Sequence, residues 1–249
     1  MNTHIKTLVL AATLAVGIPF STPFSAQAGN APLILAELFT SQGCSSCPPA
    51  DAFLGELAKR DDVLALSVHV DYWDYIGWKD PFASPENTRR QRQYGKFLGL
   101  RYIYTPQLVI DGADHVTGSD RARVLEKITK AAKSKRLAVG IKRDGEGLRV
   151  NIPAGGPGDV KDRAAVWVVL FDDRHDTEIK RGENSGRTLS YYNVVQAMTR
   201  IGTWTGKAME IRAGLSELPA KKADNGAVIL QSLNTGRILG VARVALKKS

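Results

Sequence analysis

The spacing of apolar residues divides the chain into two parts that meet near residue 137. In the first part, apolar runs at residues 33–39 and 63–70 are short enough for buried strands. Between them, apolar residues recur at helical spacing: Ala50, Phe53, Leu54, Leu57 and Ala58. A strand, helix and strand in this order predict two parallel neighbouring strands.

Two further helices are predicted from their start and stop signals. Ser84 and Pro85 are typical of an N-cap and a first helical residue, and Gly99 is typical of the end. Ser119 is expected to cap the last helix of this part. Its apolar stripe consists of Val124, Leu125, Ile128, Ala131 and Ala132.

A hairpin is predicted between these two helices. The apolar run at residues 107–110 follows Pro106, and a strand tolerates proline at its beginning. The turn at residues 111–112 lets residues 115–118 pair back onto it. The first part therefore reads β-α-β-α-β-β-α, which predicts an α/β domain over residues 29–136.

Strand patterns dominate from residue 137 to residue 249. Leu148, Val150 and Ile152 alternate with polar residues, as in a half-buried antiparallel strand. Further strand-like runs cover residues 164–171, 189–198, 208–212, 227–233 and 238–246. Strands grouped after an α/β block predict a separate, mostly antiparallel, sandwich-like domain over residues 137–249.

Residues 1–28 have the pattern of a cleaved export signal. Lys6 precedes an apolar stretch at residues 8–18, and small residues at 25–28 match the site that an export peptidase reads. An uncleaved anchor is the alternative. No later run approaches the ~20 apolar residues of a membrane span. We expect a mature protein beginning near Gly29, located in the periplasm or secreted, without a span after cleavage.

The charge does not indicate a nucleic-acid partner. The chain has 34 basic and 25 acidic residues, for a net charge of +9. The basic residues are scattered, without a basic amphipathic helix or a long basic run, so we interpret the excess as favouring solubility. The sequence does not indicate an oligomeric state.

The two cysteines, Cys44 and Cys47, stand at the start of the first predicted helix. Pro48 and Pro49 fit only in a first helical turn, which places Cys44 outside the helix and Cys47 at its opening. Helix N–H groups and the helix dipole favour a thiolate there, the attacking species in thiol–disulfide exchange. We expect Cys44, the outer and more accessible cysteine, to be the nucleophile and Cys47 to resolve the mixed disulfide.

Three other interpretations of the cysteine pair stay open. The pair could be a structural bridge, although so short a loop gains little stability from closure. It could bind Cu(I) or zinc, with His69 or His115 as a further ligand, in a metal carrier or chaperone. It could also be a vestige in a binding scaffold. The leading hypothesis is exchange with protein or small-molecule thiols and disulfides, without metal or organic cofactor.

Five motifs carry a resemblance to a known family. They are ELFTSQGCSSCPPAD at residues 37–51, HVDYWD at 69–74, GWKDPF at 77–82, YTPQ at 104–107 and RGENSG at 181–186. They resemble the blocks of a secreted bacterial family catalogued as domain of unknown function 1223. This resemblance implies a thioredoxin-like fold followed by a β domain, and it brings no established activity.

Resemblance to the wider thioredoxin superfamily implies a catalytic role for Cys44, Cys47 and Pro106. It implies a cis Thr105–Pro106 bond in a loop that faces the cysteines. Gly43 stands where thioredoxins carry tryptophan. Glu37 lies seven residues before Cys44, whereas the buried acid of thioredoxins lies six before. Glu37 could accept the proton of Cys47, or it could be a structural glutamate with its own partners.

Three other segments have two interpretations each. The aromatic and acidic stretch at residues 71–82, which includes Asp71 and Trp73, could form a lid or substrate groove near Cys44 or pack a domain junction. His69 could support the site or be a satisfied core histidine. Residues 181–186 predict a turn, or a contact surface toward the first part of the chain.

Overall fold

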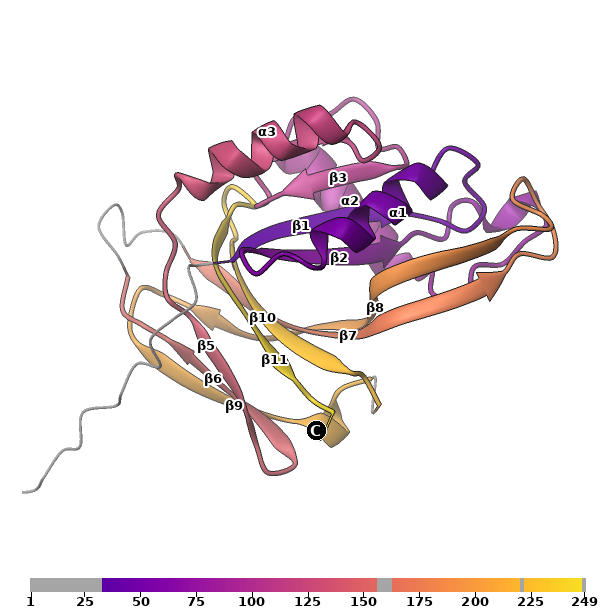
Figure 1. Ribbon diagram of the computed structural model, residues 1–249. Helices are drawn as coiled ribbons and strands as arrows, with labels where there is room; N and C mark the ends of the chain where they lie inside the picture. The colour runs from indigo at the N-terminus through magenta and orange to yellow at the C-terminus, as the bar shows by residue number, and fades with distance from the viewer. Residues whose placement is uncertain (1–32, 156–162, 220–221, 248–249) are drawn as a thin grey trace, which may run out of the picture.

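The structure is a computed structural model that describes residues 33–155, 163–219 and 222–247. The predicted export signal at residues 1–28 lies outside the described residues. Figure 1 shows helices on both faces of a large twisted sheet, with a smaller sheet beneath its C-terminal strands.

The first three elements are β1 (Ile34–Thr40), α1 (Pro48–Leu57) and β2 (Val63–His69). The two strands are parallel and in register from the pair Ile34–Val63 to the pair Thr40–His69. Every residue of both strands is buried. This confirms the predicted parallel pair, and the continuous burial explains why both strands read as apolar runs.

The next elements are η1 (Asp74–Ile76), α2 (Pro85–Phe97), β3 (Gln107–Ile110), β4 (Asp114–Thr117) and α3 (Arg121–Ala132). Ser84 caps α2 as predicted, because its side chain accepts a hydrogen bond from the backbone N–H of Asn87. The expectation that Ser119 caps α3 is wrong. Asp120 caps this helix, because its carboxylate accepts from the N–H of Arg123.

The C-terminal part consists mainly of strands. They are β5 (Gly140–Asp144), β6 (Gly147–Ile152), β7 (Ala164–Glu178), β8 (Thr188–Trp204), β9 (Met209–Gly214), β10 (Asn225–Ser232) and β11 (Ile238–Ala245), with η2 (Leu215–Glu217) after β9. Strand β7 continues well past residue 171, where its apolar run ends, because β8 pairs with it as far as the pair Glu178–Thr188.

The large sheet has eight strands in the order β11-β10-β7-β8-β2-β1-β3-β4, and β5-β6-β9 form a second, antiparallel sheet. The two parts of the chain meet between β2 and β8 through one parallel pair, Ser67 with Val194. Beside it, the side-chain amide of Asn193 donates to the carbonyl of Ala65. The protein is thus a mixed α/β fold with a large mixed sheet. The division at residue 137 and the sandwich-like description stay predictions.

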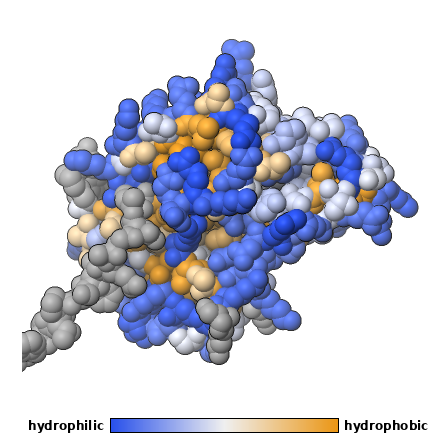
Figure 2. Space-filling view, viewed as in Figure 1, coloured by the Kyte–Doolittle hydropathy of each residue, from blue (hydrophilic) through white to orange (hydrophobic). Residues whose placement is uncertain are grey.

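Three apolar cores hold these layers together. Helices α1 and α3 cover one face of the N-terminal strands, and α2 covers the opposite face together with residues of β7, β10 and β11. The third core lies between the small sheet and the strands β7 and β10. On the face in Figure 2, hydrophilic residues cover most of the surface and hydrophobic ones appear in patches between them. No helix within the described residues is both long enough and apolar enough to cross a membrane.

The hairpin of β7 and β8 positions the candidate site. Its strands leave the C-terminal part, pass β2 and α1, and bring the hairpin end to the edge where α1 begins (Figure 1). We call residues 179–187, which connect the two strands, the hairpin tip. The tip holds its own shape through backbone bonds from Ile179 N to Arg187 O, 2.9 Å, and from Gly186 N to Ile179 O, 2.8 Å.

Candidate functional site

Cys44 and Cys47 form a disulfide at the start of α1, with their Cα atoms 5.4 Å apart. Cys47 is the N-cap, and Pro48 and Pro49 occupy the first two helical positions. The carbonyl of Cys47 accepts from the N–H of Ala50 and of Asp51, at 2.8 and 3.1 Å. The predicted placement of both cysteines relative to the helix is confirmed.

The expectation that Cys44 is the accessible cysteine is wrong for this structure. Cys44 exposes 1% of its surface and Cys47 exposes none. The exposed residues of the turn are Ser45 and Ser46, which lie between the cysteines. Two segments distant in sequence cover the disulfide.

The first covering segment is the aromatic and acidic stretch around η1. A Cβ atom added at Gly43 would lie 3.1 Å from the Cβ of Trp73 and 3.2 Å from the Cδ1 of Ile76. The indole N–H of Trp78 donates to the side-chain oxygen of Gln42 over 2.8 Å. Glycine before Cys44 therefore lets this stretch pack directly on the cysteine loop.

The second covering segment is the hairpin tip. The side-chain amide of Asn184 donates to the carbonyls of Gln42 and Cys44 over 2.9 and 3.0 Å. The carboxylate of Glu183 accepts from the backbone N–H of Ser45 over 3.3 Å. Residues 181–186 therefore form a turn, as predicted, and this turn is also a contact surface toward the first part of the chain.

Two of the predicted supporting residues lie together. The indole N–H of Trp73 donates to the hydroxyl of Thr105 over 2.8 Å. The Thr105–Pro106 bond is cis, as the resemblance implies. Pro106 lies beside Gly118, since a Cβ there would sit 3.6 Å from the Cβ of Pro106 and 3.0 Å from that of Ala50. The proline loop thus neighbours the first turn of α1.

Asp71 and Glu37 have partners elsewhere. Asp71 accepts from the hydroxyl of Thr88 on α2. Glu37 is fully buried, and Arg90 of α2 donates to its two oxygens over 2.6 and 2.9 Å. Tyr94 donates to it as well. Side chains alternate along β1, so Glu37 points to the α2 face while α1 covers the opposite one. This arrangement matches the structural alternative for Glu37.

A different acid, Asp51, lies behind the cysteines. It is 3% exposed and stands one helical turn after Cys47. It belongs to a group that we call the buried polar cluster: Thr40, Asp51, Ser67, His69 and Tyr191. Within the described residues, Thr40 Oγ1, both Asp51 carboxylate oxygens, Ser67 Oγ, His69 Nε2 and Tyr191 Oη have no hydrogen-bond partner.

These side chains come from four elements, β1, α1, β2 and β8, and meet on the side of the sheet that α1 covers. Thr40 and His69 are register partners on β1 and β2, and the rings of His69 and Tyr191 meet edge to face at 4.8 Å. Burial raises the pKa of Asp51 to about 7, against the opposing charge of the nearby His69. A carboxyl group that changes charge near neutral pH is suited to accepting and returning a proton.

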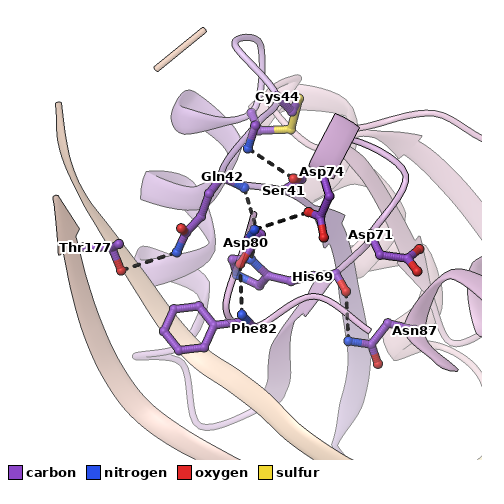
Figure 3. A network of polar contacts seen from close by, with 12 residues as sticks. Ser41, Gln42, Cys44, His69, Asp71, Asp74, Asp80, Phe82, Asn87 and Thr177 are labelled. Carbon is purple, nitrogen blue, oxygen red and sulfur yellow. Dashed lines mark hydrogen bonds and ion pairs between the residues drawn. A yellow bond between two sulfur atoms is a disulfide. The ribbon is translucent and has the colours of Figure 1, made fainter. Parts of the chain in front are cut away.

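His69 is paired as well as buried. Its Nδ1 donates to Asp80 over 2.7 Å, and Asp80 also accepts from the backbone N–H of Gln42 over 2.9 Å (Figure 3). Burial alone would lower the pKa of His69, but the charge and hydrogen bond of Asp80 raise it above the usual value. The pKa of Asp80 is lowered, because His69 and two backbone N–H donors outweigh its burial.

Sequence reasoning had one signal for Asp51. On a helix, residues four apart share a face, and Asp51 stands four residues after Cys47 among the apolar positions that α1 buries. An acid on a buried stripe is unusual and points to a special environment. Within the described ranges, no group of three or more His, Cys, Asp or Glu side chains is arranged to hold a metal ion.

The family model "Protein of unknown function (DUF1223)" matches residues 35–231. The chain belongs to this family. The match covers most of the chain and includes Cys44, Cys47, Asp51 and the hairpin tip. The family description assigns no activity.

Two solved structures are similar to this DUF1223 protein. Protein AGR_C_4864 from Agrobacterium tumefaciens is 35% identical, with a TM-score of 0.76 over 89% of this chain and 98% of its own. HBP35 of Porphyromonas gingivalis is 13% identical, with a TM-score of 0.58 over 90% of this chain and 78% of its own. The second likeness concerns the fold alone. No curated protein matches the chain.

Proposed function

We propose that this DUF1223 protein is an exported, thioredoxin-like enzyme that exchanges its Cys44–Cys47 disulfide with thiols and disulfides in the periplasm or outside the cell. The observation that carries the proposal is the disulfide at the first turn of α1, between cysteines with two residues between them. The strand order β2-β1-β3-β4, with a cis proline before β3, supports the thioredoxin-like description. The pattern of residues 1–28 supports export.

The exchange proceeds in two balanced steps. The thiolate of reduced Cys44 attacks a substrate disulfide, so that a Cys44–substrate bond forms and the other substrate sulfur leaves as a thiolate. Cys47 then loses its proton and attacks the sulfur of Cys44. The Cys44–Cys47 bond forms, the second substrate thiolate leaves, and two electrons have passed to the substrate. The reverse sequence oxidises a substrate dithiol, and neither direction needs an organic cofactor.

Asp51, rather than Glu37, accepts the proton of Cys47 in this proposal. Residues four apart on a helix are surface neighbours, and Asp51 follows Cys47 by one turn. Its pKa of about 7 lets the carboxylate take the proton at neutral pH and release it later. His69 moderates that pKa through its charge, and Asp80 holds His69 in place.

The test compares the wild-type protein with Cys44→Ala and Cys47→Ala. Reduced protein should reduce the disulfides of insulin faster than an equal concentration of glutathione, and both variants should lose this activity. Intact mass after thiol alkylation should show one reversible disulfide per chain. Wild-type protein that exchanges no faster than glutathione would exclude catalysis. Tightly bound copper or zinc at one per chain would instead support a metal carrier.

One observation favours a second candidate function. Because Cys44 exposes only 1% of its surface, the disulfide could simply tie a loop in a binding scaffold. The two functions differ in what the insulin assay measures, since a scaffold shows no exchange. Exchange requires the cover over Cys44 to move.

A further inference from the structure

The hairpin tip bonds to the cysteine loop through backbone groups of that loop. The amide of Asn184 supplies two N–H donors, to the carbonyls of Gln42 and Cys44. The carboxylate of Glu183 supplies one acceptor, to the N–H of Ser45. The tip thus directs two donors and one acceptor at the backbone of the cysteine loop. An extended peptide that pairs with a protein backbone offers groups of the same kind, N–H donors and carbonyl acceptors.

Contacts within the tip and with the aromatic stretch fix the position of Asn184. Asn184 is 1% exposed, and its side-chain oxygen accepts from the guanidinium of Arg187 over 2.8 Å. Gly182 has a positive φ of 78°, and a Cβ there would lie 3.3 Å from the Cβ of Trp78. The tip therefore fits between the cysteine loop and the aromatic stretch, with the Asn184 amide fully bonded.

We propose that the hairpin tip occupies the substrate position, and that the substrate is a cysteine in an extended polypeptide which displaces the tip. This inference rests on the proposed thiol–disulfide exchange and names the class of its substrate. The arriving chain takes over the hydrogen bonds that Asn184 and Glu183 make to Gln42, Cys44 and Ser45. A small thiol offers fewer backbone groups and has to wait for the tip to open by itself.

The experiment measures how fast thiols reduce the Cys44–Cys47 disulfide. Two thiols with the same local chemistry are compared: N-acetylcysteine methylamide, and a blocked, unstructured peptide of about eight residues with one central cysteine. The proteins are wild type, Asn184→Ala, and Ser185→Ala as the matched control. Ser185 is an exposed neighbour in the same tip, and its hydroxyl donates to the carbonyl of Lys180, within the tip itself. Circular dichroism establishes that all three are folded.

We expect Asn184→Ala to accelerate reduction by the small thiol about tenfold or more, since two hydrogen bonds that close the tip are lost. The same substitution should accelerate reduction by the peptide severalfold less, because the peptide replaces those bonds in the wild-type protein. Ser185→Ala should leave both rates within about twofold of wild type, as expected for a surface substitution.

Two results would overturn the inference. If Asn184→Ala accelerated reduction by both thiols equally, the tip would open independently of which thiol approaches the disulfide. Unchanged rates in Asn184→Ala would mean that the tip does not limit access. Neither result bears on the insulin assay, and a failed insulin assay leaves these reduction rates measurable, so the two proposals fail separately.

Discussion

Asp51→Asn tests the buried acid through stability, without any need for a substrate. Asparagine has nearly the shape of aspartate but carries no charge at any pH. The pKa of Asp51 rises from 3.8 to about 7 on folding, because the carboxylate is buried on the inner face of α1. At 1.36 kcal/mol per pKa unit, ionisation of Asp51 costs the folded state about 4 kcal/mol above neutral pH.

The sign of the effect follows from proton binding. Between pH 3.8 and pH 7 the folded protein holds a proton on Asp51 that the unfolded chain has released. Stability from this group is complete below the unfolded pKa and is lost as pH rises to the folded pKa. The stability of Asp51→Asn relative to wild type should therefore increase by about 4 kcal/mol from pH 4 to pH 8.

The assay is urea unfolding of the oxidised proteins, followed by circular dichroism at several pH values between 4 and 8. His69 on β2 and Asp80 before α2 act on the charge of Asp51, and Arg187 of the hairpin tip lines the same surface pocket as Asp51. Both proteins contain all three groups. Glu56→Gln is the control, because Glu56 is an acid of the same helix that lies exposed. The difference in the free energy of unfolding between Glu56→Gln and wild type should vary little with pH.

The reasoning would be refuted if the difference in the free energy of unfolding between Asp51→Asn and wild type stayed constant from pH 4 to pH 8. A constant difference would mean that Asp51 ionises normally in the folded protein. The role of Asp51 as proton acceptor for Cys47 would then lose its basis, because a carboxylate with an ordinary pKa accepts protons poorly at neutral pH.

Three further substitutions test other parts of the site. Glu37→Gln leaves Arg90 buried without its counter-charge and should cost about 3–5 kcal/mol in urea unfolding, while the pH profile of exchange stays unchanged. A shifted profile would restore Glu37 as the proton acceptor. Gly55→Ala places a Cβ 2.5 Å from the ring of Tyr192 and should cost about 1–3 kcal/mol; a neutral result would contradict the close packing of α1 on β8. Cys47→Ala should accumulate mixed disulfides on Cys44 in intact-mass spectra, and equal trapping by Cys44→Ala would contradict the unequal roles.

Local patterns determined the elements that build the site. The two apolar runs and the helical stripe between them were sufficient to predict β1, α1 and β2, because a parallel pair buried on both faces has little room for polar residues. Pro48 and Pro49 fixed the start of α1, since only a first turn tolerates missing N–H groups. The placement of Cys47 at the N-cap follows from these short-range constraints alone.

The tertiary structure decided which polar groups serve the cysteines. Whether Glu37 or Asp51 lies behind them depends on the face that each element turns to its neighbour. In β1 a shift of one residue exchanges the faces, so the sequence distance to Cys44 could not decide it. The pairing of Glu37 with Arg90, and the burial of Asp51 beside His69, appear only when α1 and α2 lie on opposite faces of the sheet.

The burial of Cys44 could also not be predicted from the sequence alone. Asn184 lies 140 residues from Cys44 and reaches it because β8 joins β2 and carries the hairpin past α1. Local patterns specify elements through hydrogen bonds and side-chain periodicity over a few residues. Which distant turn comes to lie on which helix start depends on how the strands pair across the whole sheet, so only the assembled fold shows that the cysteines are covered.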